Sequence, residues 1–104
     1  MHIAYLRRKI KNKEYRITLH ATKKRLERGI TTEEIEETIN NGKIIERYEK
    51  DKHASSCLVF GFTNAGRPIH VVLSYTPIVW IITVYEPDEK EWIDFEKRRK
   101  HEKK

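Results

Sequence analysis

The spacing of hydrophobic residues changes once along the chain, near residue 43. Before that point apolar residues recur every three or four positions, which is the period of an amphipathic helix. After it they form short runs rich in Val, Ile and Tyr, which are typical of strands. Helices followed by strands predict an α+β fold, with N-terminal helices packed on one face of a sheet.

The first two predicted helices are short. The helical spacing of Ile3, Leu6 and Ile10 predicts the first one, after which the chain reads as extended. The second helix can start at Thr18, a suitable N-cap. It can end at Gly29, because glycine readily adopts the left-handed conformation found at helix ends.

The third predicted helix has the clearest boundaries. Thr31 and Glu34 have the spacing of a capping box, and Ile30 can pack on Ile35 as a hydrophobic staple. Gly42 then closes the helix. Four carboxylates in its first turns are favoured by the helix dipole: Glu33, Glu34, Glu36 and Glu37.

The rest of the chain predicts a sheet and a last helix. Short turn-rich gaps separate four strand-like segments and favour a four-stranded antiparallel meander, with strands at residues 43–49, 56–63, 68–75 and 78–85. Residues 88–104 start with acidic residues and end in a basic run. They predict a C-terminal helix that docks through Trp92 and Phe95.

Length and charge narrow the class of protein. The 104 residues suit a single domain, and 22 Lys and Arg against 16 Asp and Glu give a net charge of +6. This charge favours a polyanionic partner, which leaves RNA, DNA and an acidic protein open. A lone cysteine, Cys57, with no signal or membrane-spanning segment, predicts a cytoplasmic location. Abundant Lys, Glu and Ile without Gln suggest a thermophilic source.

The second predicted helix concentrates positive charge. On a helical wheel Leu19 and Leu26 fall on one side, and the other side holds His20, Ala21, Lys24, Arg25 and Arg28. We expect the leucines to face the core. We interpret Lys23 and Lys24 as solvent-exposed side chains or as ion-pair partners of the glutamates in the third helix.

Arg25 and Arg28, one turn apart, can grip a phosphate, and His20 can move a proton there. Alternatively, both arginines are tied to the third helix's glutamates in ion pairs that serve thermal stability.

Polar residues of the predicted sheet form a second candidate cluster. If Tyr75 pairs with Ile78 across a two-residue turn, His70 lies opposite Thr83, with Tyr85 diagonal on the same face. That face is either core or an open groove. Considered one at a time, His70 is more simply interpreted as a histidine whose ring is hydrogen-bonded to a backbone group. Tyr85 is more simply interpreted as a core aromatic residue whose hydroxyl reaches water.

The remaining histidines and the cysteine carry no clear chemistry. His2, His53 and His101 fall in terminal or loop contexts, and Cys57 reads as a small core residue in a strand. No His, Cys, Asp and Glu set has metal-ligand spacing, so we expect neither a metal nor another cofactor.

An ordered series of motifs resembles the domain of unknown function 4258. The motifs are Thr18-Leu19-His20-Ala21, Arg25, Arg28-Gly29-Ile30, Gly42, Gly66-Arg67-Pro68-Ile69-His70-Val71-Val72 and Thr83-Val84-Tyr85-Glu86-Pro87. The likeness runs from about residue 15 to 92 and leaves 93–104 as a basic tail. This family is similar to RelE-like ribonuclease toxins, which implies helices on an antiparallel sheet, metal-free chemistry and a neighbouring antitoxin, one candidate being a zinc-finger protein.

The resemblance implies a metal-independent endoribonuclease, the toxin of a toxin-antitoxin pair. We expect attack by the 2′-hydroxyl of an RNA, messenger RNA at the ribosome included, to leave a 2′,3′-cyclic phosphate. Arg25 and Arg28 would hold the phosphate, His20 or His70 would act as base or acid, and Tyr85 would orient or donate a proton. Further RNA contacts are assigned to Lys24, Arg67 and Thr83. The alternative is a non-catalytic RNA- or protein-binding module of the same fold.

Overall fold

The computed structural model describes residues 2–49 and 55–100. Within them the fold contains three helices, a five-stranded sheet and a separate two-stranded sheet. The elements follow in the order α1 (Ile3–Lys11), β1 (Arg16–Ile17), α2 (Leu19–Glu27), α3 (Thr32–Asn41), β2 (Lys43–Tyr48), β3 (Ser56–Phe62), β4 (Pro68–Ser74), β5 (Trp80–Tyr85), β6 (Trp92–Ile93) and β7 (Lys97–Arg98).

The main sheet is mixed, so the prediction of a four-stranded antiparallel sheet was wrong. Its strand order is β1-β5-β4-β3-β2, and the last four strands form the expected antiparallel meander. The fifth strand, β1, pairs in parallel with β5 through Arg16 opposite Trp80 and Ile17 opposite Ile81. Two residues are too few to carry a strand periodicity, and only the contact with β5 makes this segment a strand.

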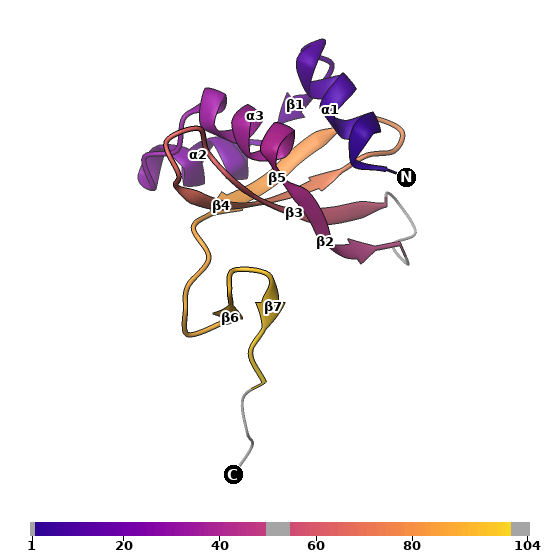
Figure 1. The fold of residues 1–104 in the computed structure, drawn as a ribbon. Coiled ribbons are helices and arrows are strands. Elements are labelled where there is room, and N and C mark those ends of the chain that lie inside the picture. The colour runs from indigo at the N-terminus through magenta and orange to yellow at the C-terminus, as the bar shows by residue number, and fades with distance from the viewer. Residues whose placement is uncertain (1, 50–54, 101–104) are drawn as a thin grey trace.

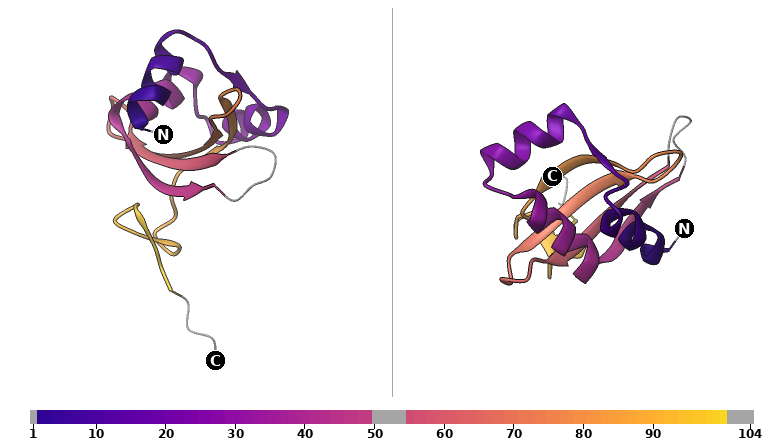
Figure 2. Two further views of the ribbon diagram at one scale, coloured as in Figure 1. Left: turned by 90° about the vertical axis from the view of Figure 1, so that its right-hand side faces the viewer. Right: turned by 90° about the horizontal axis from the view of Figure 1, so that it is seen from above.

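The helices and the C-terminal segment lie on opposite faces of the main sheet (Figure 1). A quarter turn of the molecule shows the same layering (Figure 2). One core fills the space between the helices and the sheet, and it joins Leu6, Ile10, Ala21, Ile30, Ile35, Ile39, Cys57, Val59, Ile69, Val71, Leu73, Tyr75, Val79, Ile81 and Val84. Burial raises the pKa of the Cys57 thiol to about 11, so this cysteine acts as a core residue. In the described ranges no helix is both long and apolar enough to cross a bilayer.

The predicted helix ends are confirmed. The Thr18 hydroxyl accepts a hydrogen bond from the Ala21 amide at 3.0 Å, and the capping box of Thr31 and Glu34 is complete. Gly29 has a φ of 62°, as expected for the residue after a helix. Gly42 has ordinary extended backbone, and glycine is needed there because a side chain would collide with the Thr38 carbonyl oxygen at 2.4 Å.

Helix α2 is rotated relative to the orientation that its leucines predicted. Ala21 is its buried residue, whereas Leu19 is 90% exposed and Leu26 is 64% exposed. The reason is the anchoring of both helix ends to β5. The Thr18 hydroxyl donates to the Ile82 carbonyl oxygen at 3.3 Å, and the Arg28 guanidinium donates to the Val84 carbonyl oxygen at 2.6 Å.

The predicted C-terminal helix is also wrong. Residues 88–100, called here the strap, form two turns and the small sheet of β6 and β7 below the main sheet (Figure 1). Asp94 and Phe95 have φ angles of 51° and 65°, which an α-helix excludes. Trp92 and Phe95 do dock as expected, but on the sheet face that the helices leave open.

Candidate functional site

The register of β4 and β5 differs from the predicted one. His70 lies opposite Tyr85, and Thr83 lies opposite Val72. The predicted two-residue turn is a five-residue connection, residues 75–79, so that Ser74 pairs with Trp80. A bulge follows along β5 and shifts the pairing by one further residue. Together these changes bring the imidazole and the phenol together as direct cross-strand neighbours.

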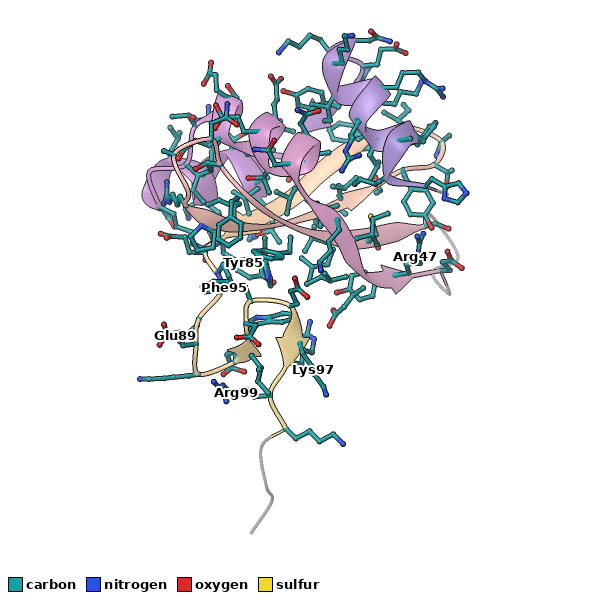
Figure 3. All side chains as sticks on the ribbon, in the orientation of Figure 1. Arg47, Tyr85, Glu89, Phe95, Lys97 and Arg99 are labelled. Atoms are coloured by element: carbon teal, nitrogen blue, oxygen red, sulfur yellow. The ribbon has the colours of Figure 1, made fainter. Side chains whose placement is uncertain are left out.

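His70 and Tyr85 face away from the helices. Their strand neighbours Val71 and Val84 belong to the core under the helices, and side chains alternate along a strand. His70 is fully buried, and the strap packs on it: the Trp92 ring meets the imidazole edge-on with centroids 4.5 Å apart. Figure 3 shows Tyr85 and Phe95 close together where the strap meets the sheet.

The hydrogen bonds of His70 define its tautomer. Its Nε2 lies 2.5 Å from the Phe95 carbonyl oxygen, which can only accept, so Nε2 carries the proton. Nδ1 of a neutral ring is then the acceptor for the Tyr85 hydroxyl at 3.3 Å. Burial lowers the pKa of His70 below its ordinary value, although the Phe95 carbonyl and nearby Glu46 oppose the shift. Burial also raises the pKa of Tyr85.

Three polar side chains that sequence reasoning missed lie beside this pair. Arg98 of β7 binds Glu46 of β2 through two hydrogen bonds of 2.7 and 3.1 Å, and the Tyr48 hydroxyl donates to the same carboxylate. Burial alone would raise the pKa of Glu46, but the bonds from Arg98 and Tyr48 outweigh it and lower that pKa. Burial, then Glu46, raises the pKa of Tyr48 to about 12. No local motif marks these residues, because Arg98 is 50 or more positions from the other two in the sequence.

A surface hollow of about 520 Å³ opens beside Tyr85 at the edge of the strap. We call it the strap hollow; its lining residues are Arg28, Tyr85, Glu86, Asp88, Glu91, Trp92 and Arg98. The Arg98 guanidinium stacks on the Trp92 ring at 4.7 Å. Two arginines and three carboxylates line the hollow, so it offers both cations and candidate proton acceptors, with no excess of positive charge.

The predicted cationic cluster does not assemble as one site. Arg28 lines the strap hollow with Tyr85, but His20 and Arg25 are not among its lining residues. His20 is exposed on α2, on the helix side of the sheet. Arg25 is half-buried; its guanidinium contacts the Ile30 carbonyl oxygen at 3.5 Å, and its Nε is buried without a partner among the described residues. Neither Arg25 nor Arg28 is seen in an ion pair with α3.

The three predicted RNA contacts have different surroundings. Lys24 pairs with Glu27 of its own helix at 3.4 Å. Arg67 is a cross-link: its guanidinium binds the carbonyl oxygens of Arg28 and Gly29, each at 2.8 Å, and the carboxylates of Glu34 and Glu86. Its hydrogen bond with Glu86 raises its pKa. Thr83 is half-buried, on the same side of β5 as Tyr85, and does not line the strap hollow.

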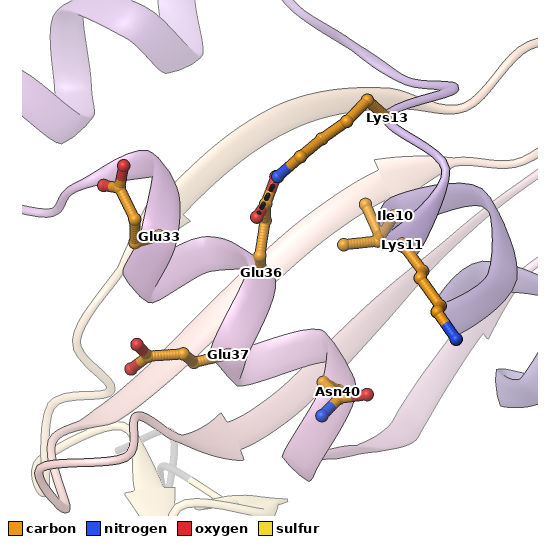
Figure 4. Close-up of a pocket in the computed structure, with 7 residues that line it drawn as sticks. All are labelled: Ile10, Lys11, Lys13, Glu33, Glu36, Glu37 and Asn40. Carbon is orange, nitrogen blue, oxygen red and sulfur yellow. Dashed lines mark hydrogen bonds and ion pairs between the residues drawn. The ribbon is translucent and has the colours of Figure 1, made fainter.

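A second hollow, of about 560 Å³, lies between α1 and α3 (Figure 4). Lys13 crosses it to Glu36 at 2.6 Å, and Tyr15 also donates to Glu36 at 2.5 Å. Its walls carry the acidic face of α3 and none of the predicted site residues.

The described residues include no group of three or more His, Cys, Asp and Glu side chains that could hold a metal ion. His2 is exposed, and His53 and His101 lie outside the described residues.

These features define an α+β domain with a mixed sheet, helices on one face, and a histidine-tyrosine pair under a C-terminal strap on the other. The sequence profile described as Domain of unknown function (DUF4258) matches residues 17–86, so the chain belongs to this family. Neither the curated proteins nor the solved structures include a match to the chain. The expected similarity to RelE-like toxins is therefore not supported by any of these comparisons.

Proposed function

We propose that this protein is a metal-independent endoribonuclease that acts at the strap hollow. The observation that carries the proposal is the position of Tyr85, whose phenol lines the hollow with Arg28 and Arg98 while its hydroxyl contacts His70 at 3.3 Å. Cleavage by the 2′-hydroxyl needs a proton acceptor, a proton donor for the leaving 5′-oxygen and cations at the phosphorane.

The Tyr85–His70 contact suggests a proton relay. The Tyr85 oxygen accepts the proton of the 2′-hydroxyl while its own proton passes to Nδ1 of His70. The 2′-oxygen attacks phosphorus, and the P–O5′ bond breaks to leave a 2′,3′-cyclic phosphate. The proton then returns through Tyr85 to the leaving 5′-oxygen. Glu46 lies close enough to His70 to raise its pKa and so favours the transient imidazolium.

The arginines that act in the proposed site differ from the pair predicted from the sequence. Arg28 and Arg98 take the role of opposing the phosphorane charge, since both line the hollow. Arg28 uses one guanidinium nitrogen to bind Val84, so its position is fixed by the fold. Arg25, His20 and Lys24 have no catalytic role in this proposal, because none of them lines the hollow.

The proposed partners are RNA, with messenger RNA at the ribosome as one substrate, and a cognate antitoxin. The hollow is not itself rich in positive charge, so RNA affinity would come from cations around it. Arg16 and Lys23 are exposed and form no ion pair with any residue of 2–49 or 55–100. Steering by these charges would bring RNA to the molecule before it reaches the hollow.

A non-catalytic RNA-binding module is the second candidate, and the burial of His70 favours it. The ring is fully buried, and its Nε2 is engaged by the strap. If the relay is never used, His70 simply holds the strap on the sheet. In that case RNA binds through surface cations and is released without being cleaved.

The proposal is tested by Tyr85→Phe, which keeps the ring and removes the hydroxyl. A labelled single-stranded RNA is incubated with the full chain in EDTA, and 2′,3′-cyclic phosphate ends are measured. We expect Tyr85→Phe to lower the cleavage rate at least about 100-fold, the usual contribution of a proton-transfer group, with RNA affinity unchanged.

Tyr5→Phe is the matched control, since the Tyr5 hydroxyl also has a hydrogen bond, to the Tyr75 carbonyl at 3.2 Å, but lies among the core contacts on the helix side. Arg25→Gln separates the two site assignments: it keeps full cleavage if the strap hollow is the site. RNA binding by the wild type without any cleavage would reject the nuclease and select the binding module.

A further inference from the structure

The outward side of α2 carries two leucines that the fold leaves uncovered. Leu19 and Leu26 are 90% and 64% exposed, and Lys23 is exposed between them. The seven-residue separation puts the leucines on one side of the helix, about 10 Å apart along its axis. We call Leu19, Lys23 and Leu26 the α2 outer stripe.

The exposure of this stripe is fixed by the fold. Thr18 and Arg28 hold the two ends of α2 on β5 through bonds to the Ile82 and Val84 carbonyl oxygens. Arg67 adds a third anchor by binding the carbonyl oxygens that follow the helix. Rolling the leucines onto the sheet would break these bonds. The helix therefore presents its apolar side to solvent in the folded protein.

The charge around the stripe selects the kind of partner. Lys23 is the cation on the stripe itself, whereas the other three cations of residues 19–28, Lys24, Arg25 and Arg28, lie on the opposite side of the helix. Lys23 forms no ion pair with any described residue. Packing α2 of a second copy on this stripe would bring two Lys23 side chains together, which like-charge repulsion disfavours. A complementary surface is apolar and acidic.

We propose that the α2 outer stripe is the docking surface for an acidic amphipathic helix of another protein. Its apolar side covers Leu19 and Leu26, and a carboxylate on it meets Lys23, the helix-on-apolar-surface mode of recognition. This inference goes beyond the proposed nuclease and does not depend on it, because no residue of the stripe lines the strap hollow.

The test uses a phage-displayed library of 18-residue helical peptides, randomised along one side and selected on the full chain. We expect enrichment of carboxylates and of large apolar residues at seven-residue spacing. An enriched peptide, measured by fluorescence anisotropy, should bind the variant Leu19→Ser/Leu26→Ser at least about tenfold more weakly than wild type. Lys23→Glu should weaken it about fivefold, and a peptide with one matching Glu changed to Lys should recover the loss.

Ile78→Ser is the matched control, because Ile78 is a 42% exposed apolar residue in the β4–β5 connection. It should bind the peptide like wild type. Equal binding by the double leucine variant, or failure of the charge-swapped peptide to recover affinity for Lys23→Glu, overturns the proposal. A wild-type dimer in sedimentation that the leucine variant lacks also overturns it, since the stripe would then join two copies of this chain.

Discussion

His70 is the residue whose environment the tertiary structure changes most. Its neighbours come from three parts of the chain: Tyr85 from β5, Glu46 from β2, and Phe95 and Arg98 from the strap. Desolvation outweighs the hydrogen bond that His70 donates to the Phe95 carbonyl oxygen and lowers the pKa of the imidazole. The folded protein therefore takes up a proton at His70 less readily than the unfolded chain does.

This difference predicts a pH dependence of stability. Between the ordinary histidine pKa of about 6.5 and the lower folded pKa, the unfolded state binds more protons, so stability falls as the pH falls. Between pH 6.5 and 5.5 we expect the free energy of unfolding to fall by up to about 1.4 kcal/mol per pH unit because of His70. His70→Gln should flatten this slope in urea titrations.

The pH range separates His70 from the carboxylates. Glu46 and Glu34 have lowered pKa values, so their contribution to stability is lost only at more acidic pH. His20→Gln is the control, because His20 is exposed on α2. An unchanged slope in His70→Gln would show that the buried imidazole is not the group that titrates.

At the scale of elements, the strap is held mainly by side chains. Trp92 packs on His70, Phe95 packs on Phe60, and Arg98 binds Glu46. Its own backbone pairing is limited to β6 with β7. The attachment of the strap to the sheet therefore depends on a few aromatic and ionic contacts. Strands β3 and β4, by contrast, are joined by backbone pairing at seven positions.

Removing the Trp92 ring should detach the strap. Trp92 is 5% exposed, and truncating a buried Trp or Phe usually costs about 3–5 kcal/mol. We expect Trp92→Ala to lower the free energy of unfolding by about 3 kcal/mol in urea titrations. The His70 pKa, followed by NMR, should move back towards its ordinary value.

Ile93→Ala is the control for this experiment, because the neighbouring side chain is 37% exposed. Its effect should stay within about 0.5 kcal/mol. If Trp92→Ala left both stability and the His70 pKa unchanged, the strap would not be what buries the imidazole.

For the whole molecule, part of the positive charge carried by the 22 Lys and Arg side chains is already paired with carboxylates. Lys9, Lys13, Lys43 and Arg67 all lie in ion pairs. The number of cations left for RNA is therefore smaller than the composition implies. This limits the salt dependence that RNA binding can show.

We expect RNA binding to use about three phosphate contacts, which corresponds to a slope near −2 in a plot of log affinity against log salt for a single strand. Affinity for poly(U) should then fall about 20-fold between 50 and 200 mM salt. Filter binding measures this slope. Arg16→Gln should reduce the magnitude of the salt slope by about 0.7. Arg67→Gln should lower stability instead, because the half-buried Arg67 links Arg28, Gly29 and Glu34 through hydrogen bonds. Salt-independent binding would contradict an electrostatic RNA surface.

The sequence by itself determined the helix ends and the meander. Thr18, Thr31 and Glu34 cap their helices through bonds within three residues, and the apolar runs after residue 43 form strands. Such interactions are local, so spacing alone reveals them. The family followed from the motifs in the same way.

Only the tertiary structure decided the rotation of α2, the register of β5 and the fold of the strap. Each depends on partners far apart in sequence: Arg28 with Val84, His70 with Tyr85, and Phe95 with His70. A periodicity says that a side of a helix is apolar, but not whether long-range hydrogen bonds will turn that side to solvent. The candidate site is built from such contacts, and for that reason several of its residues, Glu46, Trp92 and Arg98 included, emerged only when the chain was folded.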